Sequence, residues 1–451
     1  MSARVAFVGV GHRATRFIEE LAQPGRSARI VGFCDVSAVR MAAQNRWLRE
    51  KHGHAAVPEF SAAQFEEMIR ATAADTVVVA TVDSEHHSYI GRSLAMNCDV
   101  ITEKPMTTDA SKCRAILAAA RVHPERRVTV AFNYRWAPTN TKIKELLASH
   151  LIGDVKSVNL EWQLDLRHGA DYFRRWHSEK QCSGGLLVHK ATHHFDLVNW
   201  WTDSIPRRVY ATGGLKFYGE ANAKARGQTA LTGYPRYTGE SRAQTDPFAI
   251  DLAANPHFKA LYLDAERETG YVRDRNVFRP GIDIEDDVSV LVDYRNGLVL
   301  TYSLNAFSPR EGMRVVFNGT RGRLEYHQFE KSNGATPEND EGHLENREDR
   351  ADKPSAEGSS IRVYPHDGKP YDVPTRPSTG GHWGGDPLLT QHLFGDSAAK
   401  DEWGRVAGHE QGAASILVGI AANESLASRM PVSIDSLVPL RLDATCLSEL
   451  I

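Results

Sequence analysis

The stretch Arg4-Val-Ala-Phe-Val-Gly9-Val-Gly11-His-Arg-Ala14 decides the fold of the first part of the chain. Its apolar residues 5–8 predict a buried strand, and the G-x-G-x-x-A turn that follows opens an amphipathic helix over residues 15–22. Gly9 permits the tight turn, Gly11 lets a pyrophosphate approach the backbone, and Ala14 lets the helix pack closely on the strand. This arrangement is typical of a dinucleotide-binding turn.

The second predicted strand, residues 30–34, ends at Asp35, which lies 21 residues after Ala14. An acid at this position binds the adenosine ribose hydroxyls and repels a 2′-phosphate, so it favours NAD over NADP. The side chains of His12 and Arg13 are placed to reach the pyrophosphate, although solvated surface positions are equally compatible with them. We therefore predict NAD as the cofactor.

Outward from this turn, short apolar runs alternate with amphipathic stretches as far as residue 135. This rhythm predicts a doubly wound parallel sheet, a Rossmann domain over residues 1–135. The strands are expected at residues 5–8, 30–34, 76–80, 100–101 and 128–132, and the helices at 15–22, 38–52, 62–71 and 88–96.

From residue 136 the expected strands are longer and have alternating faces. They predict an α+β domain over residues 136–451, with a mainly antiparallel sheet that has a helix on one face. Its strands are expected at residues 155–164, 208–216, 287–294, 298–305 and 313–318, with one helix at 186–201 and a last one at 410–428. Residues 217–284 and 331–358 have the polar composition of insertions, and the second is expected to be a mobile loop.

Composition excludes several classes of protein. The net charge of -3 gives no general affinity for nucleic acid or for a membrane surface. No apolar run approaches the roughly 20 residues that cross a bilayer, and a strand begins almost at the first residue, which leaves no room for a signal peptide. The five cysteines form no CxxC pair, so we expect reduced thiols in a cytoplasmic protein.

Three further motifs carry a family resemblance. Ala80-Thr81-Val-Asp-Ser-Glu-His86 precedes Glu103-Lys104-Pro105, and Gly184-Gly185-Leu-Leu-Val-His189-Lys-Ala-Thr-His193-His194-Phe-Asp196 follows. In this order they resemble the Gfo/Idh/MocA family, named for glucose–fructose oxidoreductase and inositol dehydrogenase. The resemblance covers the chain apart from the two insertions.

The resemblance implies a Rossmann domain, an open-faced second domain, assembly as a homodimer or homotetramer, and a small sugar or glycoside as partner. It places Thr81, His86, Glu103 and Lys104 beside the cofactor. It also implies that Lys104 binds or polarises a substrate hydroxyl and that His193 is the acid/base. Hydride transfer needs such a pair, because a base takes the hydroxyl proton while a cation stabilises the developing alkoxide.

The sequence departs from the family pattern where the substrate is expected to bind. His189 occupies a position that usually holds Asp, and Val82-Asp83 replaces the usual Pro-Asn. His189, Lys190 and Tyr134 are therefore candidate extra acid/base groups, with a buried tyrosine as the alternative for Tyr134. The i, i+4 spacing of His189 and His193, with Asp196 nearby, is also that of a metal site, but since NAD supplies the redox chemistry we predict no metal.

A basic and aromatic stretch at residues 167–180 precedes the Gly184-Gly185 turn. Arginine binds carboxylate, sulfonate or phosphate with two parallel hydrogen bonds, so the stretch fits an anionic sugar, and a solvated face is the alternative. A second Gly-rich loop at residues 380–386 is expected to close over the substrate or simply to turn tightly. The candidate substrate-binding residues are Arg167, Arg174, Arg175, Trp176, His177 and His382.

Three functions remain open. The favoured one is a redox-assisted glycosidase that oxidises carbon 3, eliminates the aglycone, adds water and reduces the sugar again, with a sulfoquinovoside or hexuronide as substrate. The first alternative is a simple NAD-dependent dehydrogenase of a sugar or an inositol-like polyol. The second is a non-catalytic NAD-binding regulator, which the presence of Lys104 and His193 disfavours.

Overall fold

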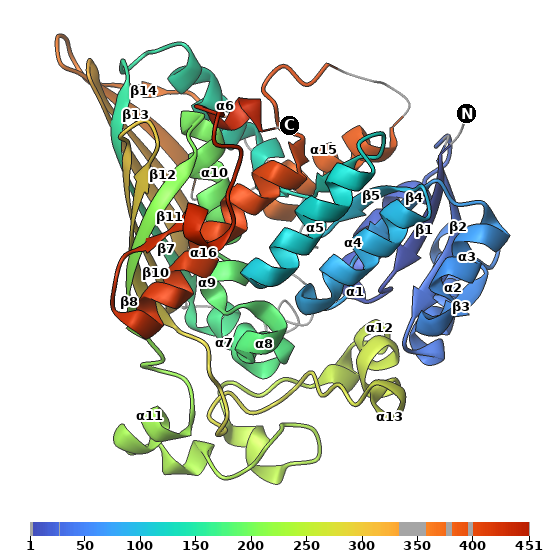
Figure 1. Cartoon of the computed structure of the whole chain (residues 1–451). Coiled ribbons are helices and arrows are strands. Elements are labelled where there is room, and N and C mark those ends of the chain that lie inside the picture. Colours follow the sequence, from blue (N-terminus) through green and yellow to red (C-terminus); the bar gives the residue numbers. More distant parts are fainter. Residues whose placement is uncertain (1–2, 27, 333–357, 376–380, 396–399, 451) are drawn as a thin grey trace.

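The computed structural model describes residues 3–26, 28–332, 358–375, 381–395 and 400–450. Two sheets organise the described chain, with a group of helices between them (Figure 1). The N-terminal sheet is Rossmann-like and parallel, and the second sheet is mixed and mainly antiparallel, as the sequence predicts.

The N-terminal sheet has the strand order β3-β2-β1-β4-β5-β6, with β15 added in antiparallel orientation at the β6 edge. Its central strand is buried on both faces, which explains the continuous apolar run at residues 5–8. The strands are β1 Arg4–Val8, β2 Arg29–Asp35, β3 Glu59–Ser61, β4 Thr76–Val79, β5 Asp99–Thr102, β6 Val128–Val130 and β15 Ala407–Gly408; the helices are α1 His12–Leu21, α2 Ala38–His52, α3 Phe65–Thr72, α4 His86–Ala95 and α5 Ala110–Val122.

The second sheet has the order β14-β13-β12-β11-β7-β10-β9-β8-β16. Along β9, Val288, Val290 and Val292 are buried while Leu291 is 48% exposed, so one face packs on helices and the other is open. The strands are β7 Val155–Asp165, β8 Pro206–Gly214, β9 Asp287–Tyr294, β10 Val299–Ser308, β11 Arg310–Gly319, β12 Gly322–Ser332, β13 Ser359–Pro365, β14 Tyr371–Val373 and β16 Val432–Ser433; helices of this region are α6 Pro138–Ala148, α7 Leu166–Arg174, α8 Lys180–Ser183, α16 His409–Ser428 and α17 Ile434–Leu437.

The single helix expected at residues 186–201 is wrong. The structure has two helices, α9 Leu186–His189 and α10 Thr192–Thr202, separated at Lys190–Ala191. Helix α16 crosses α9 so closely that a Cβ on Gly419 would lie 2.2 Å from the Leu187 carbonyl oxygen. His189 and His193 therefore lie on different helices, and the spacing argument for one shared helical face does not apply.

Two segments that are distant in sequence from the N-terminal domain pack against it. The insertion at residues 217–284 carries α11 Glu220–Ala225, then α12 Pro256–Phe258, a π-helical turn Lys259–Leu263 and α13 Glu266–Thr269, and it reaches the nucleotide-binding side of the N-terminal domain (Figure 1). Helix α15, Gly381–Phe394, also packs on that domain, with Phe394 6.1 Å from Phe17 between ring centroids. The predicted loop at residues 331–358 lies almost entirely outside the described residues.

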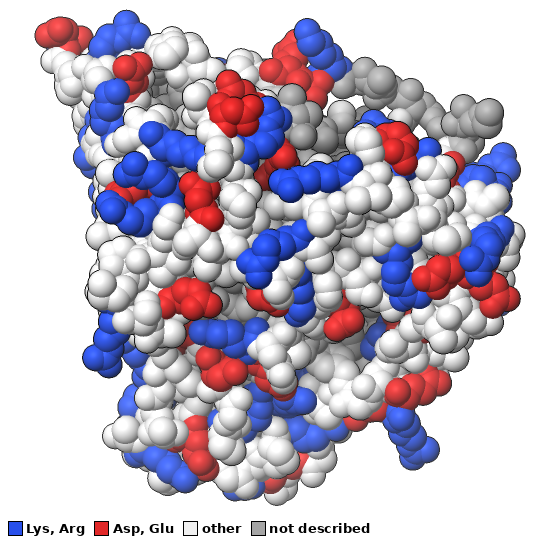
Figure 2. Space-filling model, viewed as in Figure 1, with Lys and Arg blue, Asp and Glu red and all other residues white. Residues whose placement is uncertain are grey.

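The surface carries both signs of charge without an extended field of either sign on the face that Figure 2 shows. A helix able to cross a bilayer is not found within the described ranges.

Candidate active site

The Gly-rich turn has the geometry that a dinucleotide requires. Gly9 has a φ of +78°, and a Cβ there would lie 2.6 Å from the Ala80 carbonyl oxygen, so only glycine fits. Gly11 precedes α1, whose first backbone N–H groups face the turn, and Ala14 is fully buried against the strand. These residues fit the pyrophosphate of NAD.

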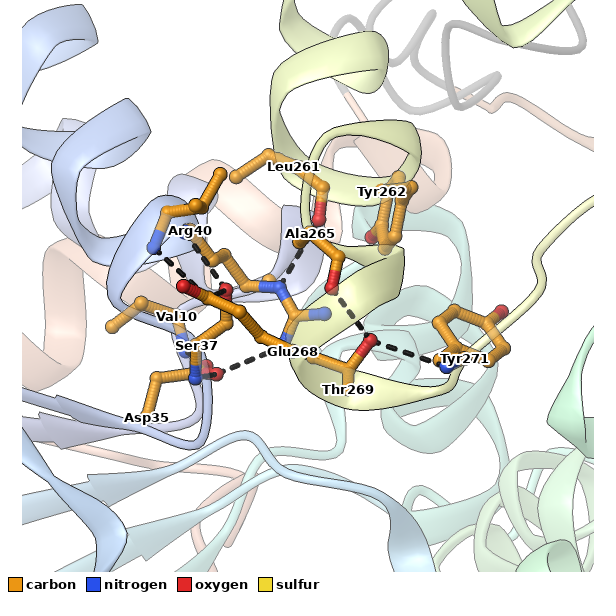
Figure 3. A network of polar contacts seen from close by, with 12 residues as sticks. Val10, Asp35, Ser37, Arg40, Leu261, Tyr262, Ala265, Glu268, Thr269 and Tyr271 are labelled. Carbon is orange, nitrogen blue, oxygen red and sulfur yellow. Dashed lines mark hydrogen bonds and ion pairs between the residues drawn. The ribbon is translucent and has the colours of Figure 1, made fainter.

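Asp35 ends β2 beside this turn. Its Oδ2 accepts from Val10 N at 2.8 Å, and its Oδ1 accepts from Ser37 N at 3.0 Å (Figure 3). A carboxylate has about four acceptor positions, and Val10 N, Ser37 N and Arg40 take three of them, which leaves one for a ribose hydroxyl. The sequence prediction did not include Arg40, whose Nη1 lies 2.9 Å from Asp35 Oδ1.

His12 and Arg13 point elsewhere than expected. The His12 ring is buried, and its centroid lies 4.8 Å from that of the Phe258 ring in the insertion. At the start of α1 it is therefore the backbone N–H of His12, and not its ring, that faces the turn. Arg13 donates from Nε to Glu103 at 2.7 Å and from Nη2 to Asp386 at 3.1 Å. Arg13 thus ties the Gly-rich turn to the Glu103-Lys104-Pro105 turn and to α15.

His86 joins the two other family turns. Its Nδ1 lies 2.9 Å from the Pro105 carbonyl oxygen and its Nε2 lies 3.3 Å from that of Thr81. Burial lowers the pKa of His86 to about 4, so the ring is neutral. The structure thus gives His86 a positioning role for Thr81 and for the turn that carries Lys104.

Lys104 lies near two buried histidines, His189 and His193. Its Nζ donates to the His189 carbonyl oxygen at 3.4 Å. Burial lowers the pKa of both His189 and His193 well below the usual value, and the charge of Lys104 is the next largest cause for each. Both imidazoles are therefore neutral near pH 7 and are able to accept a proton.

His193 belongs to an aromatic group with Tyr134. The two rings stack with centroids 4.1 Å apart, and His193 is 1% exposed. Lys190 donates to the Tyr134 hydroxyl at 3.1 Å, and its Nζ lies 4.7 Å from the Trp162 ring centroid. The structure thus brings together the side chains of His193, Tyr134 and Lys190.

His189 forms a buried pair with Asp83. Its Nδ1 lies 2.5 Å from Asp83 Oδ2, and both side chains are buried. Burial raises the pKa of Asp83 and lowers that of His189, so the two share one proton near neutral pH. The two positions that depart from the family pattern, 83 and 189, thus contact each other.

Helix α15 supplies the remaining wall. His382 and Trp383 have left-handed backbone angles, and the His382 ring lies 5.3 Å and the Trp383 ring 4.9 Å from Tyr134. His382 Nδ1 lies 2.7 Å from Asp386 Oδ2, and although burial raises the pKa of Asp386, Arg13 and His382 hold it below its usual range. The second Gly-rich loop therefore contacts the site rather than merely turning.

The arginines of the basic stretch, which were predicted to bind substrate, mainly form contacts within the protein. Arg174 is 3% exposed and donates to the Phe248 carbonyl oxygen at 2.8 and 3.0 Å, so it anchors the insertion. Arg175 pairs with Asp171 at 2.9 Å, and Arg167 is in the first turn of α7. Trp176 and His177 do reach the site: their rings stack at 3.7 Å, and His177 lies 4.1 Å from His189.

The alternative of a metal site is not supported. Asp196 binds Arg135 through both oxygens, at 2.6 and 2.7 Å, and both side chains are fully buried. No cluster of three or more His, Cys, Asp or Glu side chains suited to a metal ion occurs in the part of the chain that the structure describes.

Arg40 and Trp162 were not predicted as site residues, and Trp383 and Asp386 lie in the second Gly-rich loop but were given no role of their own. Trp162 comes from β7, distant in sequence from every motif, so no local spacing indicates it. Asp83 was noticed as a departure, but nothing in the sequence shows that it meets His189.

Known proteins and family models match this chain over most of its length. The family model for the NAD-binding Rossmann fold of the Gfo/Idh/MocA oxidoreductases matches residues 3–132, and the model for their C-terminal α/β domain matches residues 144–434. The chain is 36% identical to YteT of Bacillus subtilis (strain 168), described as an oxidoreductase, over 96% of this chain and 98% of that protein. It is 27% identical to an inositol 2-dehydrogenase of Acidothermus cellulolyticus over 50% of this chain and 59% of that protein.

Among solved structures, an oxidoreductase from Agrobacterium radiobacter in complex with NAD+, L-tartaric acid and magnesium has the same fold. The TM-score is 0.60 at 14% identity, covering 97% of this chain and 100% of that one.

Proposed function

Because this chain belongs to the Gfo/Idh/MocA family of NAD-dependent oxidoreductases, we propose that it transfers hydride between NAD and a ring hydroxyl of a sugar or polyol. The observation that carries the proposal is that the charge of Lys104 lies near two neutral, buried imidazoles, those of His193 and His189. An oxidation of this kind needs one base and one cation at the reacting hydroxyl.

In this mechanism, NAD accepts the hydride from the carbinol carbon when it is bound. His193 takes the hydroxyl proton, because burial keeps it neutral. Lys104 stabilises the negative charge that develops on the oxygen. Tyr134 and Trp383 give the sugar ring apolar faces to pack on.

The test is NADH formation with a panel of sugars and inositols. His193→Gln is expected to lower kcat by about 10²-fold or more, the usual contribution of a general base. His194→Gln is the matched control, since His194 is the next residue on α10 and contacts the Tyr302 hydroxyl at 2.9 Å. Equal losses in the two variants, with both folded, would contradict the assignment of His193.

One observation favours a second function, the redox-assisted glycosidase. Oxidation at carbon 3 acidifies the proton on carbon 2, and elimination across carbons 1 and 2 needs a second base, which a dehydrogenase does not. The Asp83–His189 pair, next to Lys104, is a candidate for this second base. Water then adds at carbon 1 and the ketone is reduced again, so NAD is unchanged over the cycle.

For this second function, two of the arginines predicted to bind an anionic glycoside have partners within the protein. Arg174 is used by the insertion and Arg175 pairs with Asp171, so neither guanidinium is assigned to a substrate. Aryl glucosides and aryl glucuronides should therefore be compared directly.

The test is aglycone release with less NAD than substrate. A glycosidase releases many aglycones per NAD, whereas a dehydrogenase accumulates NADH in proportion to product. Asp83→Asn is expected to lower aglycone release by about 10²-fold while NADH formation from the free sugar persists. Release that never exceeds one per NAD would exclude the glycosidase and leave the dehydrogenase.

A further inference from the structure

The insertion covers the nucleotide-binding turns with residues 256–273, a segment we name the clasp. It begins about 220 residues after Asp35, yet it packs on the turns that follow β1 and β2 (Figures 1 and 3). Arg40 Nε donates to the Leu261 carbonyl oxygen at 3.2 Å. Glu268 accepts from Val39 N at 3.1 Å and from the Ser37 hydroxyl, which ties the clasp to the start of α2.

Apolar contacts reinforce these bonds. Leu252, Phe258, Leu261 and Tyr262 form a small buried cluster with Ala43 of α2. The clasp is therefore a packed element of the nucleotide side of the molecule, not a loop that happens to pass it.

Tyr262 reaches the point where the pyrophosphate is expected. Its hydroxyl oxygen lies 3.2 Å from the His12 backbone N, the first N–H of α1, and 3.8 Å from where a Cβ of Gly11 would be. A phenol accepts a hydrogen bond from an amide and also donates one to a phosphate oxygen. The same hydroxyl therefore suits a dinucleotide at this turn.

Arg273 brings positive charge to the same point. It is 6% exposed, and its guanidinium carbon lies 4.4 Å from the Tyr262 ring centroid and 5.2 Å from that of Phe258. The nearby carboxylate is Asp171, which already pairs with Arg175 at 2.9 Å. Burial raises the pKa of Asp171, but the charges of Arg175, Arg273 and Arg174 hold it at about 2.

Arg273 is thus a buried guanidinium beside the Tyr262 ring, while Asp171 already pairs with Arg175. Buried charge is costly unless it is paired, and the pyrophosphate of a dinucleotide carries two negative charges. We propose that the clasp is part of the cofactor site, in which Tyr262 and Arg273 bind the pyrophosphate of NAD and keep the cofactor bound between turnovers.

The experiment measures cofactor release from the full-length protein, without substrate. Protein loaded with NADH is mixed with excess NAD+, and the decay of bound-NADH fluorescence gives the release rate. Arg273→Gln is expected to accelerate release at least tenfold, and Tyr262→Phe two- to fivefold. Arg242→Gln is the matched control, because Arg242 lies in the same insertion but pairs with Glu240, and its release rate should equal that of the wild type.

Glu268→Gln provides an independent variant if Arg273→Gln does not fold, since it loosens the clasp without touching the pyrophosphate, and it too should accelerate release. Wild-type release rates in folded Tyr262→Phe and Glu268→Gln would overturn the proposal. So would slower release in Tyr262→Phe, because the hydroxyl would then compete with the pyrophosphate. None of these rates depends on the catalysed reaction, so they stand or fall separately from the proposed function.

Discussion

At the scale of single residues, Asp35 and Arg40 together determine which nicotinamide cofactor fits. Asp35 favours the free ribose hydroxyls of NAD, whereas an arginine in this region accommodates the 2′-phosphate of NADP. Here both are present, and their side chains are 2.9 Å apart. The preference for NAD over NADP therefore depends on the carboxylate of Asp35.

Asp35→Ser is expected to weaken NADH binding about tenfold and to strengthen NADPH binding by at least as much, because Arg40 is already in place for the 2′-phosphate. Fluorescence titrations with both cofactors measure the two dissociation constants. In the double variant with Arg40→Met the gain for NADPH should disappear. Unchanged NADPH affinity in the single variant would show that Arg40 does not face the ribose.

Sequence reasoning located the residues whose roles follow from local spacing. Gly9, Asp35 and Lys104 each stand directly after a predicted strand, and parallel strands bring such positions to one edge of the sheet. Tyr262 and Asp386 come from segments with no periodic signal that connects them to this edge. Their place depends on long-range packing, which a single sequence does not express.

At the scale of elements, the break between α9 and α10 positions the acid/base groups. It turns Lys190 toward Tyr134 and leaves His189 free to meet Asp83. The residue pattern predicted one helix here. In the structure every residue from Leu186 to Trp201 is buried, so burial does not mark the break either. The close crossing of α16 at Gly419 is a contact that only the assembled fold provides.

Gly419→Ala is expected to destabilise the protein by about 2 kcal/mol, the cost of overpacking a tight contact, because the added Cβ would meet the Leu187 carbonyl oxygen at 2.2 Å. Gly412→Ala, on the same helix, meets side chains of Val130 and Met106 first and should cost less. Urea unfolding of both variants gives the comparison. A smaller loss at position 419 than at 412 would contradict the backbone contact.

At the scale of the whole molecule, the many buried neutral histidines link stability to pH. Burial lowers the pKa of His86, His177, His189, His193 and His194. The unfolded chain, with a histidine pKa of about 6.5, takes up protons that the folded chain does not. The stability these groups provide is fully present above about pH 6.5 and falls as the pH drops below it.

Unfolding near pH 5.5 should therefore take up at least about three protons, after allowance for Asp83, whose raised pKa acts in the opposite direction. That corresponds to a loss of about 4 kcal/mol of unfolding free energy per pH unit. Urea midpoints between pH 5 and 8 measure this slope. A flat profile below pH 6.5 would mean that these histidines are already protonated in the folded protein.

From the open face of the second sheet we predict that the chain forms a homodimer or homotetramer. Tyr210, Leu291 and Val299 are 39%, 48% and 38% exposed, and they share one face because Leu291 pairs with Tyr210 across β8 and β9. Adjacent apolar side chains on an open sheet are typical of an interaction surface.

Leu291→Lys is expected to convert the oligomer to a monomer in light-scattering chromatography, because a buried lysine without a partner opposes association. Val36→Lys is the control, since Val36 is 64% exposed and lies outside this sheet. A wild-type protein that is monomeric would contradict the predicted homodimer or homotetramer. A Leu291→Lys variant that stays oligomeric would place the interface on another face, and the sheet would then be open for a different reason.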